Sequence, residues 1–218
     1  MLIAFDTETT GLSNKHHRII EMGAMCIVDG KCQPNKIYHC YLNPQCPVDP
    51  GAQKVHGLSN EFLSDKPLFS DIHQDFLDFV TGHTLVIHNA PFDVGFLDAE
   101  LARCGRSSIH TFCEVIDSLV KARELFVGQK NSLDALCQRF SIDRSSRTLH
   151  GALIDAELLA KVYLAMNTHQ NELTIAKKEI SEEIISKGIQ YTEAIKVLKA
   201  NADEVSRHEA FMKDWCGA

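Results

Sequence analysis

The first residues that suggest chemistry are two acids near the N-terminus. Asp6 and Glu8 directly follow residues 1–5, an apolar run that is typical of a buried strand. Residues two positions apart on a strand point to the same face of a sheet, so these carboxylates repel each other unless a cation lies between them. The spacing therefore predicts a cation-binding site at the end of this strand.

A third acid, Asp155, lies on the apolar face of a predicted helix over residues 151–166. Leu158 and Leu159 stand three and four positions after it. A carboxylate on such a face is strongly unfavourable unless it is paired or binds a metal. His150 precedes the helix and can reach the same cavity from its loop. We therefore expect Asp155 and His150 in one site.

The fourth acid is Asp93, in the first turn of a helix that follows residues 85–87. Alone it would be structural, because an acid in a first turn favours the helix dipole. Together, however, the four carboxylates lack dedicated basic partners, and oxygen ligands favour Mg²⁺ or Mn²⁺ over zinc. Two such ions about 3.5–4 Å apart form a phosphoryl-transfer clamp. His150 could then activate the attacking water, since its charge changes near neutral pH.

The pattern around these residues predicts the elements that position them. Strands are predicted over residues 1–5, 18–28, 36–42, 85–87 and 112–115. Helices are predicted over residues 69–80, 92–104, 117–126, 132–140 and 151–166, with Ser132 as an N-cap. Three leading strands followed by alternating helices and strands indicate an α/β fold, with a mixed five-stranded sheet flanked by helices.

The pattern changes near residue 168. Beyond a polar boundary at residues 167–171, the sequence favours helix but has few large apolar residues. We predict one domain over residues 1–167, a linker or loosely held helix over residues 168–191, and a separate helical tail over residues 192–218.

The net charge limits how the chain could meet a nucleic acid. It has 22 Lys and Arg and 29 Asp and Glu, a formal charge of −7, which excludes a globally basic protein held on phosphates. Residues 103–147 nevertheless hold 8 basic and 5 acidic residues, a local +3 that could face phosphates. The charge therefore argues against tight independent binding, and indicates a need for metals and partners.

Compartment signals are few. No run reaches the about 18 apolar residues that span a bilayer, and the N-terminus lacks the basic region of a signal peptide. The cysteines form no close pair typical of zinc sites. We therefore expect a cytoplasmic protein with reduced thiols and no membrane partner.

Three ordered motifs resemble those of the DEDDh exonuclease superfamily. They are FDTETTGL at residues 5–12, IHNAPFD at residues 87–93 and HGALIDA at residues 150–156. Within the superfamily, VHGL at residues 55–58 and NSLDALC at residues 131–137 are most similar to the proofreading epsilon subunits of bacterial DNA polymerase III. The resemblance covers residues 1–167 and implies an RNase H-like fold and 3′→5′ removal of nucleotides from DNA.

The resemblance also implies roles for the site residues. Asp6, Glu8, Asp93 and Asp155 would bind two divalent cations, with Asp6 bridging them, and His150 would be the general base. The terminal nucleotide would meet Asp6, Glu8, Thr9, Leu12, His56, Asn89 and Asp155. Two alternatives stay open here: Leu12 could pack in the core, and His56 and Asn89 could order their loops through hydrogen bonds.

The C-terminal residues resemble partner-binding segments of the same subunits. Gln170, Leu173 and Ile175 have the form of a sliding-clamp ligand, in which glutamine bonds the pocket rim and the apolar residues fill a groove. Phe211 and Trp215 would bind the polymerase alpha subunit, as aromatic anchors on a short tail suit an interface; the alternative is a helix that packs back on its own domain. A small theta-type subunit is a further implied partner.

Two other functions remain compatible with these motifs. An RNA-trimming exonuclease of the same superfamily would have an indistinguishable active site. A structural polymerase subunit with an idle nuclease would belong to another class, although all five catalytic residues are present.

Overall fold

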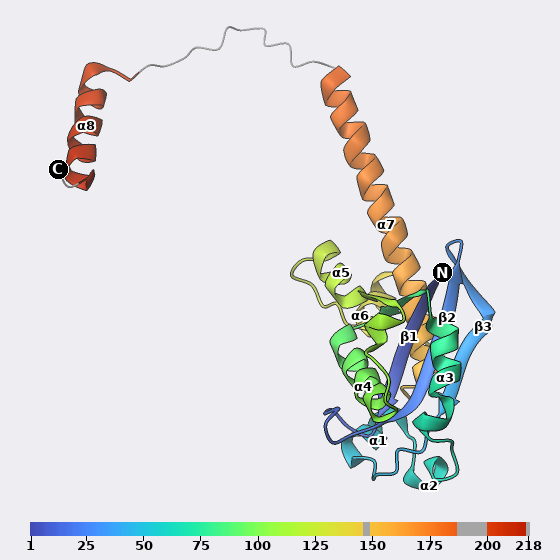
Figure 1. Ribbon diagram of the computed structural model, residues 1–218. Helices are drawn as coiled ribbons and strands as arrows, with labels where there is room; N and C mark the ends of the chain where they lie inside the picture. Colours follow the sequence, from blue (N-terminus) through green and yellow to red (C-terminus); the bar gives the residue numbers. More distant parts are fainter. Residues whose placement is uncertain (146–148, 187–199, 217–218) are drawn as a thin grey trace. The chain divides into compact units, whose positions relative to one another are not determined.

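The computed structural model describes residues 1–145, 149–186 and 200–216 (Figure 1). Its sheet has five strands in the order β3-β2-β1-β4-β5. They are β1 (Leu2–Thr9), β2 (Ile19–Val28), β3 (Lys31–Tyr41), β4 (Thr84–Ile87) and β5 (Glu114–Asp117). The first three strands pair antiparallel, whereas β4 runs parallel to β1 and to β5. The predicted mixed five-stranded sheet is confirmed.

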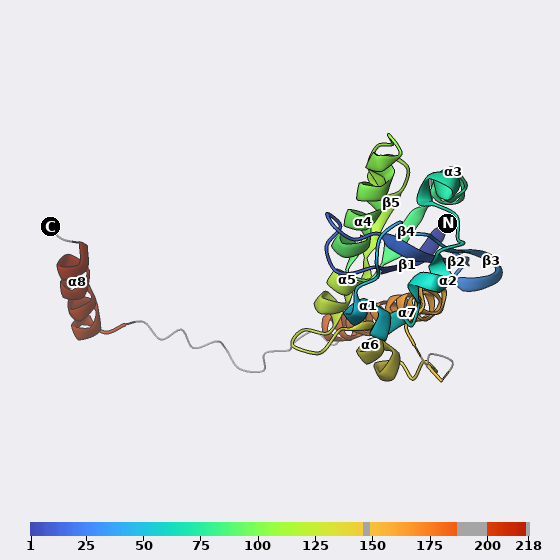
Figure 2. The same ribbon diagram turned by 90° about the horizontal axis from the view of Figure 1, so that it is seen from below.

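Helices cover both faces of this sheet (Figures 1 and 2). They are α1 (Pro50–His56), α2 (Asn60–Leu63), α3 (Phe69–Val80), α4 (Ala90–Arg103), η1 (Ile109–Thr111), α5 (Ser118–Leu125), α6 (Leu133–Arg139) and α7 (Ala152–Ser186). One core joins α3 and α4 to Ile3 and Phe5 of β1. The other joins α5, α6 and α7 to Ala4. Successive residues of β1 thus face opposite cores, as the two-residue period of a strand requires.

Carboxylate and hydroxyl caps fix where the helices begin. The Ser132 hydroxyl accepts the Ala135 N–H at 3.3 Å, which confirms the predicted N-cap of α6. Asp117 accepts the N–H groups of Asn89 and Ala90 at 3.2 Å, and that of Leu119 at 2.8 Å. One side chain therefore holds the starts of both α4 and α5 at the ends of the parallel strands.

Gly23 of β2 allows the first turn of α7 to lie against the sheet. A Cβ at this position would be 2.2 Å from the carbonyl carbon of Ala152 and from the backbone nitrogen of Leu153. These are backbone atoms, which cannot move away by a change of rotamer as a side-chain atom can. The absence of a side chain at Gly23 is therefore what sets the distance between β2 and the helix that carries Asp155.

Replacing Gly23 with alanine should destabilise the protein strongly, because α7 would have to move away from the sheet. We expect a loss of at least about 3 kcal/mol in the free energy of unfolding, measured by urea denaturation. Gly82→Ala is the matched control: Gly82 has φ of 74° with nothing near its Cβ position, so only a backbone cost of about 1–2 kcal/mol applies. Equal losses for the two variants would contradict this packing.

The helix predicted over residues 151–166 is longer than expected. In the structure, α7 continues to Ser186. Residues 167–186 contain no glycine or proline, and the low apolar content that suggested a linker does not end a helix made of good helix formers. His169 stacks on Phe126, with ring centroids 5.7 Å apart and planes inclined by 25°. The compact N-terminal unit accordingly spans Met1–Leu173, and a second unit spans Thr174–Ala218.

The described part of the second unit includes α8 (Ala202–Cys216), within the predicted helical tail. Phe211 lies on this helix with 56% of its surface exposed. The side chains of Gln170, Leu173, Ile175 and Trp215 lie outside the part that the structure describes, so their predicted contacts stay predictions. Among the described helices, none is both long enough and apolar enough to pass through a bilayer.

Candidate active site

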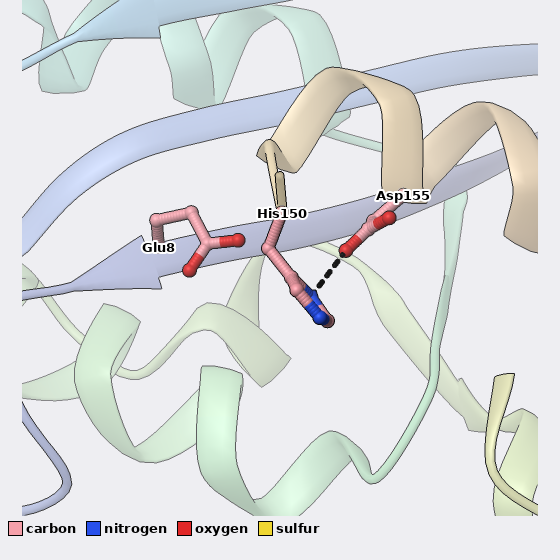
Figure 3. Close-up of side chains that lie close together, drawn as sticks. All are labelled: Glu8, His150 and Asp155. Atoms are coloured by element: carbon pink, nitrogen blue, oxygen red, sulfur yellow. Dashed lines mark hydrogen bonds and ion pairs between the residues drawn. The ribbon is translucent and has the colours of Figure 1, made fainter. Parts of the chain in front are cut away.

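Three of the predicted site residues meet at one end of the sheet (Figure 3). Glu8 of β1, His150 just before α7 and Asp155 of α7 each offer a ligand atom, and these atoms all lie within 4.8 Å of one another. We call these residues the acid–histidine cluster. The His150 Nδ1 and Asp155 Oδ2 atoms are 3.1 Å apart. Asp155 is buried at 4% exposure, whereas His150 is exposed, so the cluster opens toward solvent on the histidine side.

The position of His150 depends on α1 as well as on α7. Its backbone N–H donates to the carbonyl of Val55 at 3.2 Å. The neighbouring Leu149 lies over Gly57, where an added Cβ would be 2.6 Å from Leu149 Cδ1. Gly57 itself has φ of 77°, a left-handed conformation that favours glycine at the end of a helix. The end of α1 therefore holds the loop that carries His150.

Strand β1 extends beyond its predicted end and carries Asp6 and Glu8 within it. The two residues lie on the same face, as predicted, and both are half-buried. In the pairing with β2, Asp6 lies opposite Gly23 and Glu8 opposite Glu21. A register shift follows between Glu8 and Thr9. Asp6 thus lies two positions before Glu8 on the face that α7 covers.

Asp93 is not one of the three residues of the acid–histidine cluster. It is 4% exposed in the first turn of α4, and its Oδ1 accepts the Thr7 hydroxyl at 2.6 Å. Thr7 points to the face opposite that of Asp6 and Glu8, as β1 alternates. Burial raises the pKa of Asp93 to about 7, against the opposing effect of the Thr7 hydrogen bond.

The raised pKa predicts how Asp93→Asn changes stability in the absence of metal. The unfolded chain releases this proton near pH 4 and the folded protein near pH 7, so the wild type loses stability progressively between these values. Asparagine keeps an acceptor for Thr7 without the charge. In EDTA we expect the variant to melt higher by on the order of 5–10 °C at pH 8 and equally at pH 4. Thermal melts across this range that show a constant difference would contradict the assignment.

A cavity of about 380 Å³ is lined in part by four of the predicted substrate residues. They are Glu8, Thr9, Leu12 and His56. Leu12 is 87% exposed, so the alternative that it packs in the core is wrong. The volume is within the range of small-molecule sites.

One ring nitrogen of His56 accepts a hydrogen bond, and the other has no hydrogen-bond partner in the described part of the chain. Its Nδ1 accepts the N–H of Leu58 at 3.0 Å, which orders the turn after α1. That bond places the ring proton on Nε2, which is buried and has no hydrogen-bond partner among the described residues. Burial lowers the pKa of His56, so the ring is neutral at physiological pH. His56 therefore orders its loop and also keeps a donor at the cavity.

These residues match a known family. The family model described as Exonuclease matches residues 3–163. The chain is 44% identical to the DNA polymerase III subunit epsilon of Salmonella typhimurium over 95% of its own length and 90% of that protein, with the same figures for the subunit of Escherichia coli strain K12. The chain belongs to the family of DNA polymerase III epsilon subunits. The predicted resemblance is confirmed, and this epsilon-family chain is a 3′→5′ exonuclease.

Solved structures agree with this assignment. Exonuclease X in complex with 5′ overhanging duplex DNA is 26% identical to the chain, with a TM-score of 0.64 over 78% of this chain and 93% of that one. Escherichia coli exonuclease I with a dT13 oligonucleotide has a TM-score of 0.68 at 16% identity, over 80% of this chain and 42% of that one, and shows the fold alone. Exonucleases of this family depend on divalent metals, and the acid–histidine cluster of the epsilon-family chain could hold one.

The structure also shows what the sequence reasoning missed in this epsilon-family chain. Asp49, Val55 and Phe92 line the cavity with the predicted residues. Val55 precedes His56 and Phe92 precedes Asp93, so position beside a motif residue was the available signal. Asn89 is exposed in a left-handed conformation, with φ of 68°, and is not part of the cavity lining. Its backbone N–H bonds Asp117, whereas its side chain makes no hydrogen bond that caps α4.

Proposed function

We propose that this chain is the proofreading subunit of a bacterial replicative polymerase and removes mispaired nucleotides from DNA 3′ ends. The observation that carries the proposal is the acid–histidine cluster at the edge of a nucleotide-sized cavity, with Glu8 belonging to both. The relatives at 44% identity are epsilon subunits of DNA polymerase III, which supports DNA as the substrate and that polymerase as the partner.

Asp6, Glu8, Asp93 and Asp155 would hold two divalent cations, Mg²⁺ or Mn²⁺. The donors fit hard cations, since each offers carboxylate oxygens and Asp155 and Glu8 already converge with His150. When bound, such cations stabilise charge on the phosphate and lower the pKa of a bound water. Asp93 would bind a cation after its carboxyl group loses its proton, because burial favours the protonated form.

His150 would act as the general base. Its Nδ1 lies 3.1 Å from Asp155 Oδ2, so an Nδ1–H donated to that oxygen would orient the ring, and Nε2 would accept the proton of the attacking water. The reaction adds one water across the bond between phosphorus and the 3′ oxygen of the penultimate nucleotide. His150 takes a proton from the attacking water, and the leaving oxygen gains one. The products are a nucleoside 5′-monophosphate and a new 3′ hydroxyl.

The terminal nucleotide would occupy the 380 Å³ cavity. Leu12 would lie against its base, since this apolar side chain lines the cavity and is 87% exposed. His56 would donate from Nε2, and Thr9 and Asn89 would complete the contacts, together with the carboxylates Asp6, Glu8 and Asp155. The Thr9 hydroxyl bonds the Gly11 carbonyl at 2.7 Å, which shapes the loop that presents Leu12.

The second unit would connect the exonuclease to its partners in the cytoplasmic, nucleoid-associated replisome. Phe211 and Trp215 on α8 would bind the polymerase alpha subunit, and more than half of the Phe211 surface is exposed for this. Gln170, Leu173 and Ile175 would contact the sliding clamp; their backbone is helical in the structure. A small theta-type subunit is a further proposed partner.

Digestion of matched oligonucleotides tests the substrate. The purified chain is incubated in parallel with 3′-labelled DNA and RNA of the same sequence, with Mg²⁺ or Mn²⁺. We expect faster release of the terminal nucleotide from DNA, and faster release from a mispaired than from a paired 3′ end. A strong preference for RNA would favour the RNA-trimming alternative, and absence of hydrolysis by the intact chain would favour the idle subunit.

A further inference from the structure

The candidate site has a buried acid that the proposed mechanism does not use. Glu21 is 3% exposed in β2, a strand whose other residues from Ile19 to Ile27 are apolar or glycine. The antiparallel register places Glu21 directly opposite Glu8, so both side chains lie on the face that α7 covers. Like charges directly opposite each other destabilise a sheet. An acid at this position therefore requires a compensating interaction.

His39 of β3 supplies that interaction. Its Nε2 is 2.8 Å from Glu21 Oε1. The imidazole packs edge-on against Tyr41, with ring centroids 4.9 Å apart, which limits the orientations that the ring can adopt. His39 of the neighbouring strand β3 thus holds the Glu21 carboxylate in one place.

The same carboxylate lies beside the backbone that joins His150 to α7. A Cβ at Gly151 would be 3.9 Å from both Glu21 oxygens. The Gly151 carbonyl accepts the N–H of Asp155 at 2.9 Å, so Gly151 occupies the N-cap position without a side chain that could cap the helix. A negative charge is favourable at the start of a helix, and Glu21 brings one from the sheet.

We propose that Glu21, held by His39, is a positioning residue that fixes the segment of His150 and Gly151 at the start of α7. The general base is the most exposed member of the acid–histidine cluster, and the segment behind it determines where its ring can lie. Glu21 touches neither substrate nor water in this role. The inference rests on the proposed function of His150 as general base.

The proposal predicts a change in kcat with little change in binding. Glu21→Gln keeps the size of the side chain and an acceptor for His39 but removes the charge beside α7. With the full chain and a single-stranded DNA oligonucleotide, we expect kcat to fall about tenfold, while KM and the Mn²⁺ concentration for half-maximal rate stay within twofold. His39→Gln should lower kcat in the same direction, by a smaller factor.

Glu100→Gln is the matched control for the loss of a buried acid. Glu100 is 1% exposed on α4 and pairs with Arg18 at 2.6 Å. This variant should lose thermal stability comparably to Glu21→Gln and keep kcat within threefold. A similar tenfold loss of kcat in both variants would show a general effect of burial and overturn the positioning role.

A double-mutant cycle with His150→Ala separates the remaining explanations. If Glu21 acts through His150, adding Glu21→Gln to His150→Ala should lower the residual kcat by less than twofold. A further tenfold loss in that background would overturn the proposal, as would wild-type kcat for Glu21→Gln alone. His150→Ala by itself tests the proposed function separately from the positioning role of Glu21. Wild-type activity in this variant would refute His150 as the general base, whatever Glu21 does.

Discussion

Replacing Asp155 with asparagine should lower kcat on single-stranded DNA by on the order of a thousandfold or more, because a metal-binding carboxylate contributes several kcal/mol to the transition state. Asp155 is 4% exposed, hydrogen bonds His150 at 3.1 Å and shares the acid–histidine cluster with Glu8. The amide has nearly the same shape but no charge. Initial rates with Mg²⁺ and with Mn²⁺ measure the loss.

Asp98→Asn provides the control for the same chemical change. Asp98 lies on α4 and accepts the N–H of Ile109 at 2.7 Å and the hydroxyl of Ser108 at 2.9 Å, which anchors η1. We expect this variant to keep kcat within twofold. Asp155→Asn should also keep association with the polymerase, since α8 belongs to the second unit. If Asp155→Asn retained a tenth or more of the wild-type rate, the metal assignment would be wrong.

A chain that ends at residue 173 should keep hydrolysis of single strands and lose association with the polymerase alpha subunit. The cut follows the compact unit Met1–Leu173 and preserves the packing of His169 on Phe126. A cut at the predicted boundary, residue 167, would remove that ring contact. We expect kcat within twofold of the full chain, and no co-elution with alpha in size-exclusion chromatography.

A second truncation, after residue 200, identifies which part of the second unit matters. It removes α8 with Phe211 and Trp215 but keeps Gln170, Leu173 and Ile175. If α8 carries the contact, this chain should also lose alpha while retaining any binding to the sliding clamp. Retention of alpha by either truncated chain would refute the tail assignment.

Local spacing made much of the site predictable. The two-residue interval between Asp6 and Glu8 fixes a shared face on any strand, and Asp155 was conspicuous among leucines. The fold class was predictable from the order of the apolar runs along the chain, which indicates three leading strands and then alternating helices and strands. Each of these inferences needed only neighbours along the chain.

The parts that escaped prediction depend on contacts between distant segments. Glu21 lies in β2, which is buried on both faces. Such a strand has no alternation of apolar and polar residues from which the contacts of Glu21 could be predicted. Its relation to Gly151 arises only when α7 packs on Gly23. A helix past residue 167 was predicted only as one of two alternatives, because the low apolar content there also suggested a linker. The exposure of Leu12 likewise depends on a loop that the periodic pattern does not describe.

The central claim is that Glu8, Asp155 and their neighbours bind the divalent cations that hydrolysis needs. The most direct measurement is anomalous X-ray scattering from crystals of the wild-type chain grown with Mn²⁺ and a nucleoside 5′-monophosphate. We predict manganese peaks in contact with the carboxylates of Glu8 and Asp155, with the nucleotide in the cavity lined by Leu12 and His56. A nucleotide bound there without manganese at these carboxylates, or manganese only at other sites, would contradict the account.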